Sequence, residues 1–238
     1  MKKFGFTLAE VLITITILGL IAALTIPALM SNMDRAAWSS GLSSSFSILS
    51  RGFPQMMAEE SVDSLDQTAL WNDLVGSAND LTTPSVDLKN ELGKYFNITA
   101  ISSKFPYDVF KFDKSTKADD IGDTVRFELS NGSSMNIIFR KIPNEDCSTI
   151  VAAGGTLCEK MADIYVDVNG SKKPNAFGRD IYLFYVGNDG KVFPYGSNDT
   201  AIYDSSPEWN TTNGCQGKEP NDPLACTARV LKEGYTMK

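Results

Sequence analysis

Residues 5–30 read GFTLAEVLITITILGLIAALTIPALM, and this stretch decides how the chain is organised. It is apolar almost throughout and long enough for a helix that crosses a bilayer, which needs about 20 such residues. Lys2 and Lys3 precede it in a short leader. Glu10 is the exception, because an acidic residue costs roughly 2.5–3.5 kcal/mol at the centre of a membrane helix and less toward its ends. The sequence therefore predicts a partner for this carboxylate.

The natural partner is a new chain terminus. If the leader is cut after Gly5, the amine of Phe6 lies one helical turn from Glu10. The string Lys-Lys-Phe-Gly, followed by Phe-Thr-Leu-x-Glu and a long apolar helix, resembles the class III signal of type IV prepilins and type II secretion pseudopilins. The resemblance covers directly about the first 33 residues.

This resemblance implies a role for each matched residue. In that family a prepilin peptidase cuts after the glycine and methylates the new terminal residue, which implies cleavage between Gly5 and Phe6 and N-methylation of Phe6. It implies an assembly role for Glu10, and also for Gly19 and Pro27, which fall where family members loosen and kink the helix.

Two simpler interpretations explain less. A secretory signal has 7–15 apolar residues and a small-x-small cleavage site. Here the apolar run is longer, and Ala28-Leu29-Met30 ends in the wrong residue for such a site. A plain membrane anchor accounts for the apolar run but not for Gly5, Glu10 or the shortness of the leader.

Composition excludes several classes of function. The formal charge is −7, and losing Lys2 and Lys3 with the leader takes the side-chain count to −9. Nucleic acid is not predicted as a partner, because phosphate binding needs clustered Lys and Arg. The sequence contains no histidine, so His-based catalysis and His-containing metal sites are excluded. We expect no enzymatic activity and no cofactor.

The four cysteines follow the apolar segment and predict disulfides in an extracytoplasmic domain. They are Cys147, Cys158, Cys215 and Cys226, and they allow three connectivities. The local pairs 147–158 and 215–226 are favoured because both enclosed loops carry turn residues. A zinc site usually needs thiolates in C-x₂₋₄-C spacing, which the chain lacks.

The helix is expected to continue beyond the apolar run and to finish between Phe53 and Glu60. Apolar residues recur there at steps of three and four, as on one face of a helix. They are Trp38, Leu42, Phe46, Leu49, Phe53 and Met57. This predicts a leader at 1–5, a transmembrane and polymerisation helix at 6–30, an amphipathic continuation at 31–60 and an extracytoplasmic globular domain at 61–238.

The globular part is expected to contain an antiparallel sheet. Apolar residues alternate in 125–129 and again in 135–139, on either side of the turn dipeptide Asn131-Gly132, which is typical of a β-hairpin. Further strands are expected at 163–168, 180–186 and 191–194, and a short helix at 226–232. The fold class predicted is α+β, with a long kinked N-terminal helix packed on an antiparallel sheet, as in pilins.

A calcium site is the one metal site considered. Asp167-Val168-Asn169-Gly170 and the residues up to Asp180 resemble a stretch of bacterial pilin-like proteins, and some pseudopilins bind calcium in a C-terminal loop. An EF-hand is excluded, because Tyr165 and Ala176 stand at its first and last ligand positions. Asp167, Asn169 and Asp180 stay as candidate ligands, and an Asn-Gly turn between two strands is the simpler alternative.

Together these features predict a structural subunit, a minor pilin or a pseudopilin, of a type IV pilus or a type II secretion pseudopilus. Its expected partners are the prepilin peptidase, other pilin or pseudopilin subunits and the bacterial inner membrane. The precursor is expected there as a single-pass protein with its C-terminal domain extracytoplasmic, consistent with Lys2 and Lys3 inside. The mature chain is expected in a pilus or pseudopilus, in the periplasm or at the cell surface. The alternative is a membrane-anchored extracytoplasmic binding protein that does not polymerise.

Overall fold

A computed structural model describes residues 5, 7–75, 85–103, 105–118, 124–140, 147–217 and 219–234. The chain forms two compact units, Met1–Ala37 and Trp38–Lys238. One continuous helix, α1 (Leu8–Glu60), contributes its first part to the first unit and its remainder to the second. The expectation that this helix finishes between Phe53 and Glu60 is confirmed.

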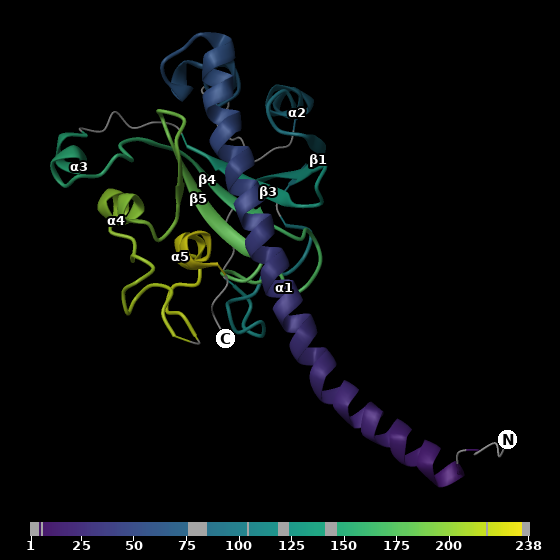
Figure 1. Cartoon of the computed structure of the whole chain (residues 1–238). Coiled ribbons are helices and arrows are strands. Elements are labelled where there is room, and N and C mark those ends of the chain that lie inside the picture. The colour runs from purple at the N-terminus through teal and green to yellow at the C-terminus, as the bar shows by residue number, and fades with distance from the viewer. Residues whose placement is uncertain are drawn as a thin grey trace. The chain divides into compact units, whose positions relative to one another are not determined.

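The second unit contains the other elements (Figure 1). Its helices are α2 (Val86–Gly93), α3 (Ser148–Ala152), α4 (Asn198–Asp204) and α5 (Cys226–Glu233), with a 3₁₀ turn at Leu65–Gln67 and a π-helical turn at Leu70–Val75. Its strands are β1 (Ile98–Ser103), β2 (Val125–Leu129), β3 (Ser134–Phe139), β4 (Lys160–Asp167), β5 (Ile181–Gly187) and β6 (Val192–Pro194).

The strands form one antiparallel sheet in the order β1-β2-β3-β4-β5-β6. The β2–β3 hairpin has the predicted turn: Gly132 has φ +85°, and the Asn131 side chain accepts a hydrogen bond from the Ser133 N–H at 3.0 Å. Side-chain oxygens of Asn commonly close turns in this way. One long helix and an antiparallel sheet confirm the α+β class.

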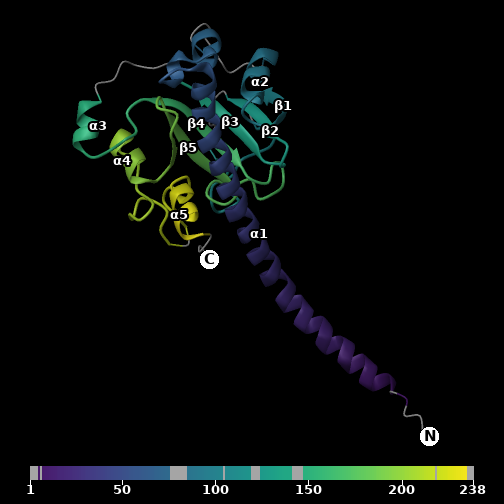
Figure 2. The ribbon, with the colours of Figure 1, turned by 45° about the horizontal axis from the view of Figure 1, so that its top comes forward.

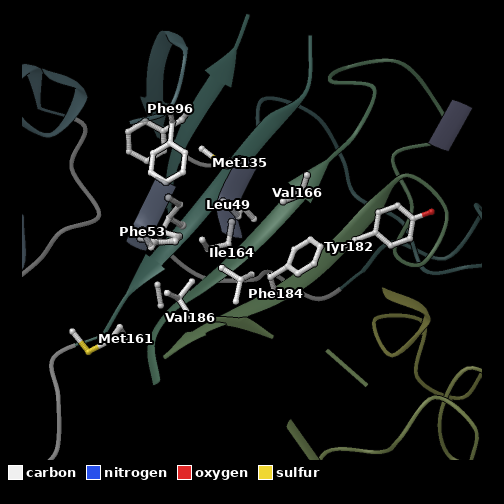
Figure 3. Close-up of a cluster of buried hydrophobic side chains, with 14 of the residues drawn as sticks. Leu49, Phe53, Phe96, Met135, Met161, Ile164, Val166, Tyr182, Phe184 and Val186 are labelled. Atoms are coloured by element: carbon white, nitrogen blue, oxygen red, sulfur yellow. The ribbon is translucent and has the colours of Figure 1, made fainter. Parts of the chain in front are cut away.

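The part of α1 from Trp38 onward packs on one face of the sheet, and Figures 1 and 2 both show it crossing over β3, β4 and β5. Figure 3 shows Leu49 and Phe53 among side chains of β4 and β5. The ring centroids of Phe46 and Phe184 are 5.8 Å apart, and those of Phe53 and Phe96 are 5.2 Å apart. The predicted helical stripe lies on the core face: Trp38, Leu42, Leu49 and Phe53 are buried, whereas Phe46 and Met57 are partly buried. The other buried residues of α1 are Ser45, Gly52 and Met56.

The opposite face of the sheet is also covered. Leu183 and Tyr185 of β5 pack there with Leu157 and Phe193. The Tyr185 hydroxyl donates to an Asp204 carboxylate oxygen at 2.9 Å, which ties α4 to this face. Because both faces are buried, β5 is apolar along nearly its whole length instead of alternating.

Both disulfides join local pairs, as the turn residues favour: Cys147 to Cys158 and Cys215 to Cys226. The first closes a loop around α3, which has no buried residue. The second is buried, with both cysteines fully inaccessible. Zinc ligation by these thiolates is thereby excluded.

Gly52 is required by close packing of α1. A Cβ at this position would lie 2.2 Å from the Phe96 ring, whereas one at Gly93 in α2 would meet nothing within 4 Å. We predict that Gly52→Ala lowers the free energy of unfolding by about 1–3 kcal/mol through overpacking. Gly93→Ala, the matched control, should leave it unchanged or raise it by up to about 1 kcal/mol, because Ala favours helix. Denaturant unfolding of both variants measures this, and equal stabilities would contradict it.

The two disulfides close loops of equal length, with a sequence separation of 11 in each. Chain entropy alone therefore predicts equal losses on their removal, each about 3 kcal/mol. We predict that the Cys215→Ala/Cys226→Ala variant loses more unfolding free energy than the Cys147→Ala/Cys158→Ala variant, because only Cys215 and Cys226 are buried in the core. Denaturant unfolding checks the order, and an equal loss from both variants would assign the whole effect to chain entropy.

Candidate functional site

The start of α1 is held by a reciprocal pair of side chains. Thr7 directly precedes the helix, and its carbonyl accepts the Val11 N–H at 3.2 Å. The Glu10 carboxylate accepts from the Thr7 backbone N–H and from the Thr7 hydroxyl, both at 2.8 Å. The Thr7 hydroxyl in turn accepts the Glu10 N–H at 3.2 Å. This is a capping box, which satisfies backbone donors that the first helical turn leaves without partners.

The capping box places the Glu10 carboxylate at the beginning of the helix. The Thr7 N–H that this carboxylate accepts belongs to the residue directly after Phe6, the predicted new terminus. Gly5 is exposed, and a Cβ added to it would meet nothing within 4 Å. Phe6 and Met1–Phe4 lie outside the described residues, so pairing of a Phe6 amine with Glu10 stays a prediction. Sequence reasoning missed the capping box, although the Thr7-x-x-Glu10 spacing signals it.

The first part of α1 exposes its large apolar side chains. They are Leu8, Val11, Leu12, Ile13, Ile15, Ile17, Leu18, Leu20, Ile21, Leu24, Ile26, Leu29, Met30 and Met33. By length and composition α1 can cross a membrane. Polar side chains within the stretch bond to their own helix: the hydroxyls of Thr14, Thr16 and Thr25 donate to backbone carbonyls at 2.7–2.9 Å. A helix in lipid must satisfy its polar groups internally in this way.

Gly19 and Pro27 both lie within α1, which is helical through each of them. A Cβ at Gly19 would meet nothing within 4 Å, so packing within this chain does not require a glycine there. Pro27 has no N–H, so the Ala23 carbonyl lacks its usual helical partner. The two positions weaken the helix locally, and their role in assembly stays a prediction.

The prokaryotic N-terminal methylation motif matches residues 1–26. This motif is the prepilin-type cleavage and methylation signature, and it includes Gly5, Thr7 and Glu10. No curated protein and no solved structure matches the chain. The motif, the long apolar helix and the disulfide-bonded α+β domain support a precursor of pilin-like or pseudopilin-like type.

The second candidate site, in the globular unit, brings together Asp167 at the end of β4, Asn169 in the following loop and Asp180 directly before β5. Asp167 and Asp180 are fully buried. The N–H of Val168, the residue after Asp167, donates to the Asp180 carbonyl at 2.9 Å. The Asp180 carboxylate accepts the N–H groups of Asn175 and Ala176 at 2.9 and 2.7 Å. The Asp167 carboxylate accepts the Asn169 N–H at 3.1 Å and the Tyr107 hydroxyl.

Protein donors therefore occupy both carboxylates, and the described residues contain no cluster of three or more acidic, Cys or His side chains able to hold a metal. Burial raises the pKa of Asp167 to about 7, and the nearby Asp180 adds to this, while the Tyr107 hydrogen bond acts in the opposite direction. Burial also raises the pKa of Asp180. Calcium prefers ionised, accessible carboxylates, so this geometry favours the Asn-Gly turn between strands over a calcium site.

Asp167 should make stability depend on pH. Its pKa is about 3.9 when unfolded and about 7 in the fold, so between these values the folded state retains a proton that the unfolded chain has released. Its stabilising contribution is thus fully present below about pH 4 and lost as the pH rises to about 7. We predict that Asp167→Asn removes this decline, which is on the order of 3–4 kcal/mol. Denaturant unfolding between pH 4 and 8 measures it.

The exposed residue Asp63 provides the control. Asp63→Asn should retain the wild-type decline in unfolding free energy with pH. An unchanged decline in Asp167→Asn would contradict the buried, protonated carboxyl. A rise in melting temperature of the wild-type chain with calcium at pH 8 would instead favour a calcium site at Asp167, Asn169 and Asp180.

Proposed function

We propose that the chain is a structural subunit, a minor pilin or pseudopilin, of a type IV pilus or a type II secretion pseudopilus. A prepilin peptidase cleaves it after Gly5 and methylates Phe6, and α1 then carries it into the filament. The observation that supports this most directly is the Glu10 carboxylate, held at the very start of an exposed apolar helix by Thr7.

The proposed mechanism follows from electrostatics in an apolar medium. Cleavage creates a charged amine at Phe6, next to the Thr7 N–H that Glu10 already accepts. Opposite charges attract more strongly in a dry helical bundle than in water, and an unpaired charge there costs several kcal/mol. Glu10 can neutralise the amine of its own subunit or that of a neighbour when the helix leaves lipid. A neighbour's amine would fix the register between subunits.

The membrane-anchored binding protein that does not polymerise uses the same apolar helix. In this alternative a free amine at Phe6 has no role, and Glu10 only caps the helix. The two proposals therefore differ in what the charge of Glu10 does. Substitutions at Glu10 and Thr7 can separate the charge from the cap, because Gln keeps an oxygen acceptor without the charge.

We predict that Glu10→Ala and Glu10→Gln are cleaved normally but enter filaments at least about tenfold less efficiently, because the amine stays unpaired in an apolar environment. Thr7→Val removes the capping hydroxyl, worth about 0.5–2 kcal/mol, keeps the charge and should still assemble. Quantifying the chain in sheared or cross-linked filament fractions measures incorporation, and gel mobility measures cleavage. Wild-type incorporation of Glu10→Gln would contradict the proposal.

A further inference from the structure

The tripeptide Asn-x-Ser/Thr, which is the acceptor pattern for N-linked glycans, recurs after the apolar segment. The pattern is short and arises by chance, so the sequence alone does not separate an acceptor from an ordinary surface loop. A transferase must reach both the Asn amide and the hydroxyl two residues later, and neither group can be occupied within the fold. The copies begin at Asn97, Asn131, Asn169, Asn198 and Asn210.

The copies that begin at Asn131 and Asn169 form two turns that are packed against each other. A Cβ on Gly170 would lie 2.7 Å from the Gly132 carbonyl oxygen. The Asn131 side chain accepts the Ser133 hydroxyl at 2.7 Å, and Ser133 is buried. The side-chain oxygen of Asn169 is buried as well. Neither copy therefore presents both of the groups that a transferase must reach.

The copies that begin at Asn97 and Asn198 lie in regular secondary structure. Thr99 belongs to β1, and its hydroxyl donates to a backbone carbonyl of β2 at 3.1 Å. Thr200 belongs to α4 and is fully buried, and its hydroxyl donates to a backbone carbonyl at 3.0 Å. In both copies the fold already occupies the hydroxyl.

The copy that begins at Asn210 differs from these four, because Asn210, Thr211 and Thr212 are all exposed. The Thr211 N–H donates to the Glu208 carbonyl at 3.1 Å, which closes a turn with Asn210 at its third position. Within the part of the chain that the structure describes, neither the Asn210 amide nor the Thr212 hydroxyl makes a hydrogen bond. Both groups are thus presented together on one exposed turn.

The loop that carries this turn is anchored to the globular unit at both ends. The Trp209 N–H donates to the Gly196 carbonyl at 2.9 Å, and the Cys215 N–H donates to the Trp209 carbonyl at 3.0 Å. Cys215 is also joined to Cys226 of α5 by a disulfide. A bulky hydrophilic group on Asn210 would therefore project from a fixed loop without displacing a core side chain.

We propose that Asn210 is an N-glycosylation site that accepts an oligosaccharide from a polyprenyl diphosphate carrier. In the transfer, Nδ2 of Asn210 bonds to the anomeric carbon of the sugar, while the bond from that carbon to the diphosphate oxygen breaks. The polyprenyl diphosphate leaves, and Nδ2 loses one proton to solvent. The proposal rests on the proposed extracytoplasmic location of the globular unit, since this pattern is modified in exported proteins.

Substitutions within the loop separate the acceptor from its recognition. Asn210→Gln removes the acceptor, and Thr212→Val removes the hydroxyl while the acceptor stays. Thr212→Ser restores a hydroxyl. Asn213→Gln is the matched control, because Asn213 is also an exposed Asn of this loop but has no Ser or Thr two residues after it. An unchanged melting temperature in each variant checks that the fold is retained.

The experiment incubates the folded full chain in detergent with a purified bacterial oligosaccharyltransferase and a polyprenyl-diphosphate-linked oligosaccharide. Intact mass and peptide mass then count and locate the glycans. We expect one glycan per chain, on Asn210, retained in Asn213→Gln and Thr212→Ser and reduced at least about tenfold in Asn210→Gln and Thr212→Val.

Three results would overturn the proposal: no transfer to the folded chain, equal transfer to several of the five Asn residues, or transfer only after unfolding. Because the chain is purified, the result does not depend on its location in the cell or on assembly into filaments. Failure of the proposed pilin function would therefore leave this result unchanged, and failure of glycosylation would leave the pilin function unchanged.

Discussion

The structure depends on one constraint: polar groups in an apolar environment must find partners within the chain or within the assembly. The first part of α1 exposes an apolar surface, so its threonines bond to their own helix and the Glu10 carboxylate bonds to Thr7. The capping box satisfies the start of the helix before any cleavage takes place. The proposed amine at Phe6 would add a charge beside a carboxylate that is already in position.

The same helix meets a second environment from Trp38 onward. There it buries a single face on the sheet, and glycine at position 52 admits the Phe96 ring. The serines of this segment are poor helix formers, so packing against the sheet holds it helical. Two buried disulfide sulfurs and the aromatic pairs around Phe53 stabilise the same core. The part of α1 from Trp38 onward thus stabilises the globular unit, whereas the start of α1 carries the chemistry of the N-terminus.

Local patterns predicted much of this fold. The Asn131-Gly132 turn identified the β2–β3 hairpin, and the stripe from Trp38 identified the buried face of α1. Strand β1, of sequence ITAISS, was missed because an edge strand has no clear alternation. Helices α3 and α4 are too short to show a period. The burial of Asp167 and Asp180, and the meeting of two Asn-Gly-Ser turns, depend on contacts between distant segments that spacing alone does not reveal.

The central claim is that Gly5 and Glu10 belong to one processing and assembly signal. Intact-mass analysis tests it most directly, on chain purified from cells with and without a prepilin peptidase. The account predicts that the chain from cells with the peptidase lacks Met1–Gly5, begins at Phe6 and carries the added mass of one methyl group. Without the peptidase it should retain its leader. A chain that keeps Met1 in both cells, or that is cut at another bond, would contradict the account.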